Sequence, residues 1–167
     1  MKRGFSLFEM LIYVSILSAV LVLFVNSLLA INRSYAVVRA EMTLDNGAIS
    51  SMERITRGIR EATSIDLVQS VFGVNPSILV LNILDTVGNT SKMTLSLINQ
   101  TLHISKDGVD QGVLLPSTVT VPKLIFYSLD SVSSKAVKIE IQLENKETGV
   151  TRRNSYYSTV ILRGSYK

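Results

Sequence analysis

The sequence contains no cysteine and a single histidine, His103, and both shortages limit the chemistry it can support. Without cysteine there is no disulfide and no thiolate ligand, so cysteine usage does not indicate a redox compartment. A zinc site needs three or four nitrogen, sulfur or oxygen ligands, and His103 alone does not supply them. A Ser-His-acid triad would also have to use this one imidazole. We therefore interpret His103 as an exposed strand residue.

Two further binding motifs are missing. The nine glycines are scattered over predicted turns and a predicted helix, and they do not gather in a phosphate-binding loop. No Asp-x-Asp-x-Asp-Gly calcium loop is present. We therefore expect no catalytic residue, no cofactor and no metal, and the protein is predicted not to be an enzyme.

The amino-terminal region is apolar over a long distance. An apolar run extends from Phe5 to Ile31, and no charged residue occurs from Met10 to Asn32. About 20 apolar residues are enough to cross a bilayer as a helix. Glu9 interrupts the run. A carboxylate inside such a helix costs roughly 2.5–3.5 kcal/mol, which indicates that Glu9 has a partner and a function.

The first residues carry a specific pattern. The segment Lys2-Arg3-Gly4-Phe5-Ser6-Leu7-Phe8-Glu9, followed by the apolar run, resembles the class III signal of type IV pilins and type II secretion pseudopilins. The resemblance covers residues 2–31 of the 167. It departs from the family at Phe8, where a branched aliphatic residue is usual.

This resemblance implies processing and assembly. A prepilin peptidase would cleave between Gly4 and Phe5 and methylate the new amino group of Phe5. Glu9 would then guide assembly by pairing with the amino terminus of a neighbouring subunit. The implied partners are other pilin or pseudopilin subunits, the peptidase, an inner-membrane assembly platform and the lipid bilayer. The filament would be a type IV pilus, a type II secretion pseudopilus or a competence filament, and the sequence does not choose among them.

Charge indicates the topology. Lys2 and Arg3 are the leader charges, and by the positive-inside rule they place the amino terminus in the cytoplasm and the chain after Arg33 outside it. The formal net charge is +4, and removal of residues 1–4 leaves 15 basic against 13 acidic residues. A balance that small argues neither for nor against nucleic-acid binding. The alternative to a filament subunit is a single-pass, membrane-anchored extracytoplasmic binding domain.

The organisation follows from hydrophobic periodicity. We expect a leader peptide at 1–4, a transmembrane and assembly helix at 5–32, its amphipathic continuation at 33–63, and a β-rich globular domain at 64–167. Apolar residues recur at mostly helical spacing in the continuation and are predicted to pack on the domain; they are Val38, Met42, Ile49, Met52, Ile55, Ile59 and Ala62. Gly47 and Gly58 weaken a helix by about 1 kcal/mol each, so either is a candidate bend.

The remaining residues alternate in a way that is typical of strands. Expected strands lie near Ile65–Ser70, Ser77–Leu84, Lys92–Ile98, Leu102–Lys106, Thr118–Leu129, Ala136–Glu144 and Ser155–Arg163. Asn99-Gln100 and Asp107-Gly108 are predicted hairpin turns, and Pro122 indicates an edge strand or a bulge. A long helix followed by strands with short connections predicts an α+β fold, a helix packed on an antiparallel sheet.

Two weaker patterns lie in the carboxy-terminal third. Lys135–Leu143 and Ser158–Arg163 resemble the closing strands of minor pilins of the J/W type. Basic and aromatic residues also cluster in sequence and could capture DNA; they are Arg152, Arg153, Tyr156, Tyr157, Arg163, Tyr166 and Lys167. Glu144 and Glu147 in the same region favour the alternative that these are solvated charges.

Overall fold

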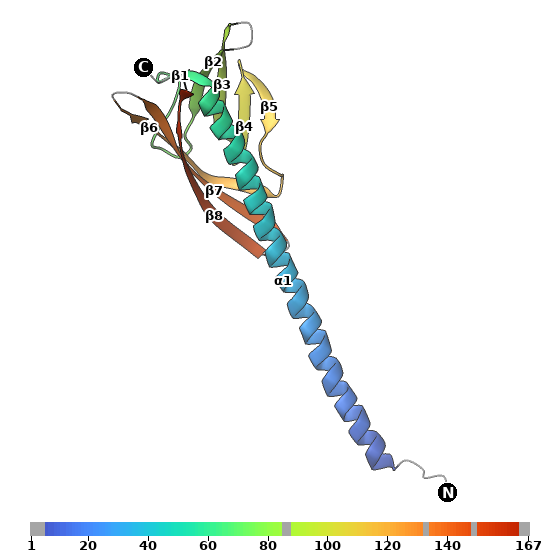
Figure 1. Cartoon of the computed structure of the whole chain (residues 1–167). Coiled ribbons are helices and arrows are strands. Elements are labelled where there is room, and N and C mark those ends of the chain that lie inside the picture. Colours follow the sequence, from blue (N-terminus) through green and yellow to red (C-terminus); the bar gives the residue numbers. More distant parts are fainter. Residues whose placement is uncertain (1–5, 85–87, 132–133, 148–149, 164–167) are drawn as a thin grey trace. The chain divides into compact units, whose positions relative to one another are not determined.

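A computed structural model describes residues 6–84, 88–131, 134–147 and 150–163. Within these residues, one helix precedes eight strands (Figure 1). Helix α1 spans Leu7–Glu61. The strands are β1 (Ala62–Ile65), β2 (Leu79–Leu84), β3 (Thr90–Ile98), β4 (Thr101–Lys106), β5 (Val109–Val113), β6 (Val119–Asp130), β7 (Lys135–Glu147) and β8 (Val150–Ile161). The predicted α+β architecture is confirmed, with the strands antiparallel throughout the paired registers.

The strands form two sheets. Among the described residues, one sheet has the order β1-β2-β3-β4-β5 and the other the order β6-β7-β8. The helix and strands form two compact units, residues 1–39 and residues 40–167. In the second unit, helix residues such as Leu44 and Ile55 share one hydrophobic core with residues of both sheets, including Leu95 and Phe126.

The face of α1 that is buried in this core differs from the predicted one. Ile55, Ile59 and Ala62 are buried as expected, whereas Val38, Met42 and Ile49 are 51%, 61% and 66% exposed. The buried helix positions are Ala40, Leu44, Gly47, Ala48, Ser51, Ile55, Gly58 and Ile59. Most of them are small. The prediction is therefore confirmed for Ile55, Ile59 and Ala62, and Met52 also packs against the core, whereas it is wrong for Val38, Met42 and Ile49, where smaller residues of α1 face the sheets.

The two helix glycines permit this close approach. A Cβ atom at Gly58 would lie 2.7 Å from Sδ of Met93, and one at Gly47 would lie 3.2 Å from Cδ2 of Leu115. The helix continues through both positions. Each glycine therefore serves packing against the core, and neither ends the helix.

Several strand predictions are confirmed. In β7, Val137, Ile139, Ile141 and Leu143 are fully buried while Lys138 is exposed, which is the predicted alternation. β2 lies between β1 and β3, as its apolar sequence indicated. Pro122 lies in the edge strand β6, at a register shift between Thr120 and Lys123.

The predicted hairpin turns are also present. Asn99-Gln100 joins β3 to β4, and Asp107-Gly108 joins β4 to β5. All four residues have positive φ, from 50° to 80°. A two-residue turn with positive φ at both positions matches the right-handed twist of the two strands that it joins.

Several boundaries differ from prediction, and one strand was not predicted. The helix ends at Glu61 and β1 spans Ala62–Ile65, so the strand expected near Ile65–Ser70 is displaced toward the amino terminus. The chain turns after Ile65 because the Asp66 carboxylate accepts hydrogen bonds from the amides of Val68 and Gln69. Strand β5 was not predicted, since its sequence Val-Asp-Gln-Gly-Val is short and largely polar. β8 begins five residues before the predicted Ser155.

Candidate functional site

The amino-terminal part of α1 is an apolar surface that is open to its surroundings. From Leu7 to Tyr35 every side chain is exposed. By length and composition this stretch of α1 is able to cross a membrane, and no other described helix meets that criterion. A single apolar helix of this kind is compatible with a single-pass membrane anchor.

Polar hydroxyls within this segment are satisfied by the helix itself. Ser15, Ser18, Ser27 and Ser34 each donate to the carbonyl oxygen four residues earlier, at 2.8, 2.8, 2.9 and 3.0 Å. A hydroxyl that bonds its own helix does not need water or a partner, which is the arrangement that an apolar solvent demands. These serines are therefore consistent with the apolar character of the segment.

Glu9 is different, because no cationic side chain among the described residues pairs with its negative charge. Glu9 lies in the first turn of α1, where the helix dipole favours a carboxylate. The hydroxyl of Tyr13, one turn later, lies 3.5 Å from Glu9 Oε1. A neutral donor at this distance is a weak contact and does not neutralise the carboxylate. Lys2, Arg3, Gly4 and Phe5 lie outside the described residues.

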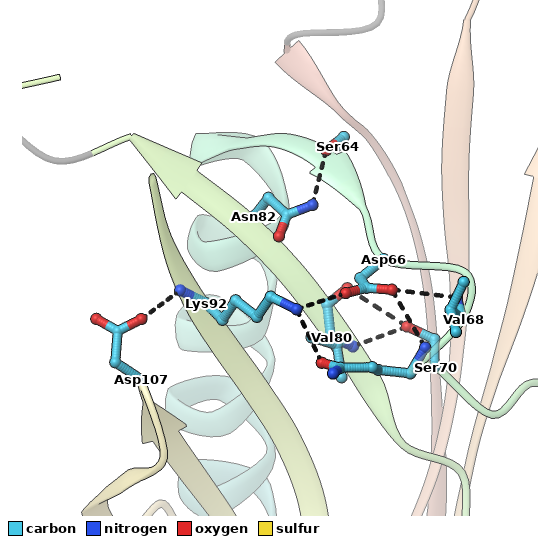
Figure 2. A network of polar contacts seen from close by, with 9 residues as sticks. Ser64, Asp66, Val68, Ser70, Val80, Asn82, Lys92 and Asp107 are labelled. Carbon is cyan, nitrogen blue, oxygen red and sulfur yellow. Dashed lines mark hydrogen bonds and ion pairs between the residues drawn. The ribbon is translucent and has the colours of Figure 1, made fainter. Parts of the chain in front are cut away.

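A second polar cluster holds the turn that follows β1 (Figure 2). The Nζ atom of Lys92 lies 2.8 Å from Asp66 Oδ2 and 3.1 Å from Gln69 Oε1. The hydrogen bond from Lys92, followed by the one from the backbone amide of Gln69, holds the pKa of Asp66 below its usual value. Ser70 donates to and accepts from the backbone of Val80. The cluster anchors the turn to β2 and β3, and each of its charges is already paired.

The single histidine is not the exposed strand residue that the sequence predicted. The His103 side chain is only 18% exposed, and its Nδ1 atom lies 2.9 Å from Asp110 Oδ2. The amide of Gly112, followed by His103, lowers the pKa of Asp110. His103 therefore links β4 to β5. The described residues contain no group of three or more His, Cys, Asp or Glu side chains arranged to hold a metal.

The proposed basic and aromatic cluster is divided by the structure. Arg153 pairs with the buried carboxylate of Glu144 through both Nε and Nη2. Tyr156 donates to Asp45 Oδ1 at 2.8 Å and so faces α1, whereas Tyr157, the next residue in the strand, is exposed. Tyr166 and Lys167, and the Glu147 side chain, lie outside the described residues.

Polar contacts also join β8 to α1 within the second unit. Asn154 Nδ2 donates to Glu41 Oε1 at 2.6 Å, and Asn145 Nδ2 of β7 donates to the carbonyl oxygen of Ala40 at 3.3 Å. Burial, assisted by the hydrogen bond to Asp45, raises the pKa of Tyr156 to about 12. These contacts between α1 and the strands β7 and β8 were not predicted from the sequence, because the paired residues are more than 100 positions apart.

These features define an α+β protein whose amino-terminal helix begins with an exposed apolar segment and one carboxylate. Comparison with family models, with curated proteins and with solved structures finds no match for the chain.

Proposed function

We propose that the chain is a minor pilin or pseudopilin, a membrane-held subunit that joins a helical filament through its amino-terminal helix. The leader Met1–Gly4 would be removed by a prepilin peptidase, and Phe5 would become the methylated amino terminus. The amino terminus would face the cytoplasm, and the β-rich unit would lie outside the membrane. Support comes from the leader sequence and from the apolar segment of α1.

One observation carries the proposal: Glu9 is an exposed carboxylate surrounded by exposed apolar side chains. Leu7, Phe8 and Met10 are 84%, 70% and 55% exposed. In lipid an unpaired carboxylate costs roughly 2.5–3.5 kcal/mol, and the hydroxyl of Tyr13 does not offset a full charge. The amino group of Phe5 in a neighbouring subunit would supply the missing cation.

Processing is the first test. Intact-mass and amino-terminal analysis of membranes from cells that contain a prepilin peptidase should show a chain that begins at Phe5. A bulky or charged residue in place of Gly4 should block cleavage, because the peptidase has to accommodate a nearly absent side chain there. A wild-type chain that retains Met1–Gly4 would contradict the proposal.

Assembly is the second test. Glu9→Val should leave membrane insertion and cleavage intact, because it makes the segment more apolar. Incorporation into sheared filaments should fall, because a neighbouring amino terminus is left as an unpaired charge. Tyr13→Phe is the matched control, since it removes only the hydroxyl near Glu9 and should assemble normally. A permanent membrane anchor would tolerate Glu9→Val in every assay.

A further inference from the structure

Among the grooves along α1 within the unit of residues 40–167, two differ in charge. The first, which we call the acidic groove, lies between α1 and β8 and is lined by Asp45, Ala48, Ile49, Met52, Tyr156 and Tyr157. Its volume is about 490 Å³. Asp45 is its charged lining residue among the described residues, and no lysine or arginine lines it. Its floor and walls are methionine, isoleucine and tyrosine, the residue types that recur at the cores of protein interfaces.

This groove is open because β8 is an edge strand. The other edge of the same sheet, β6, is covered: the amides of Gly73 and Ser77 donate to the carbonyl oxygens of Phe126 and Leu124, at 2.9 and 3.0 Å. β8 has β7 as its strand neighbour and no strand beyond it among the described residues. The acidic groove therefore lies at the uncovered side of this sheet.

A basic surface lies farther along the same helix. Arg54, Arg57 and Arg60 occur three residues apart and are all exposed, and we call them the basic ridge. Arg57 lies 3.0 Å from Glu53, four residues before it. Within the described part of the chain, Arg54 and Arg60 have no hydrogen-bond or ion-pair partner. The ridge borders a second groove, of about 650 Å³, which Lys106 of β4 also lines, together with Glu53 and Glu61 of α1.

The helical positions place Arg54 and Arg57 on a different side of α1 from the groove. At about 100° per residue, Asp45, Ile49 and Met52 fall within one stripe, Arg57 and Arg54 lie about 110° and about 170° from its centre, and Arg60 lies about 50° from it. The stripe buried in the core, which includes Leu44 and Ile55, occupies the remaining side of the helix. Among the described residues, the groove thus has a carboxylate with no lysine or arginine in its lining, and the ridge has two guanidinium groups, of Arg54 and Arg60, without an ion-pair partner.

We infer that the acidic groove of one copy receives the basic ridge of a second copy of this chain. Complementary charges fix the register of such a contact, and the apolar lining of the groove supplies the desolvated centre. Because two different surfaces meet, the contact is heterologous, and repeating it produces an open helical array instead of a closed dimer. The inference rests on the proposed function, which makes neighbouring helices parallel because all of them enter the same membrane.

Parallel helices and this charge pairing set an axial offset between neighbours. Arg57, the centre of the ridge, follows Asp45 by 12 residues, which is about 18 Å along a helix. The same offset brings Glu61 of one copy to the level of Ile49 of the next. Both side chains are exposed, so this pair of positions is suitable for cross-linking.

Cysteine cross-linking of the full chain tests the contact directly, because the natural sequence has no cysteine to interfere. Two differently tagged copies are produced together in membranes, one with Ile49→Cys and one with Glu61→Cys. The inference expects disulfide-linked dimers that contain both tags. The doubly substituted chain should give longer ladders. Dimers linked through Ile49→Cys on both sides would indicate a two-fold contact and would overturn the inference.

Charge reversal tests the pairing. Asp45→Lys in the groove, or Arg54→Glu with Arg60→Glu in the ridge, should each reduce mixed cross-linking by about tenfold. A groove-reversed copy mixed with a ridge-reversed copy should recover it. Lys138→Glu, on the exposed outer face of β7, is the control. Asp45→Asn removes the charge but keeps an acceptor for Tyr156, so it should weaken cross-linking without loss of fold.

The outcomes separate this inference from the proposed function. Cross-linking that is indifferent to both reversals would overturn the charge pairing. If mixed cross-links are absent while the wild-type chain is found in sheared filaments, the groove-and-ridge contact is wrong and the filament role stands. If the chain keeps its leader and enters no filament, the proposed function fails whatever the cross-links show.

Discussion

Helix α1 contains two stretches that differ in burial and in the size of their residues. In residues 7–39 most of the side chains are large and apolar, and none is buried. In residues 40–61 the helix has a buried stripe made mainly of small residues, among them Ala40, Gly47 and Gly58. The same helix thus carries an exposed apolar surface in one stretch and a close-packing face for the sheets in the other. The size of the residues, more than their hydrophobicity, distinguishes the two.

The largest expected effect comes from separating the two stretches. A fragment that begins at Ser34 should be soluble without detergent and should unfold cooperatively, because the core of residues 40–167 is retained and the exposed apolar segment is lost. Size-exclusion chromatography and thermal circular dichroism would check this. The full chain, which keeps the apolar segment, is the comparison. A fragment that shows no cooperative melt would contradict the division into two units.

Replacing a phenylalanine by alanine should change the free energy of unfolding in the core of residues 40–167 but not in the apolar segment of α1. Phe126 is fully buried, so Phe126→Ala should lower the free energy of unfolding by about 3–5 kcal/mol. Phe24 is 63% exposed in the apolar segment, and Phe24→Ala should change the unfolding of the β-rich unit by less than about 0.5 kcal/mol. Urea denaturation of the detergent-solubilised chain, followed by circular dichroism, would measure both. Similar losses from the two changes would mean that the apolar segment packs in the core.

Gly58 tests whether small residues are required on the buried stripe. Gly58→Leu should destabilise the protein by about 1–3 kcal/mol, because its Cβ would lie 2.7 Å from Sδ of the partly buried Met93 and the larger side chain would force α1 and β3 apart. Gly58→Ala should have a smaller effect, since a gain of about 1 kcal/mol in helix propensity offsets the displacement of the flexible Met93 side chain. Equal stability of the leucine variant and the wild type in the same urea titration would show that close approach is unnecessary.

Alkaline pH should test the contact between α1 and β8. The pKa of Tyr156 is raised to about 12 from an ordinary value of 10.0. The unfolded chain therefore releases the phenolic proton at lower pH than the folded chain. Stability from this group is complete below pH 10 and is lost as the pH rises toward 12. Tyr156→Phe should reduce the dependence of unfolding free energy on pH in this window, whereas the control Tyr157→Phe should keep it.

Local patterns were sufficient for much of this fold. The α+β class, the hairpin turns at Asn99-Gln100 and Asp107-Gly108, and the alternation of Val137 to Leu143 all depend on residues close in sequence. The apolar segment and Glu9 can also be recognised from the sequence alone, because a long uncharged run and one carboxylate do not depend on a tertiary contact. These features follow from backbone conformational preference and hydrophobic periodicity, which act over a few residues.

The tertiary structure decided which surfaces are free. Met42 and Ile49 repeat with the period of a core face, yet they are exposed, because two sheets close on the face that allows the nearest approach. His103 is paired with Asp110 through a hairpin, and Tyr156 reaches Asp45 across 111 positions of sequence. Burial and pairing of this kind depend on which distant segments meet. The sequence by itself therefore determined the elements and the apolar segment, while packing determined the grooves and charges that remain available to a partner.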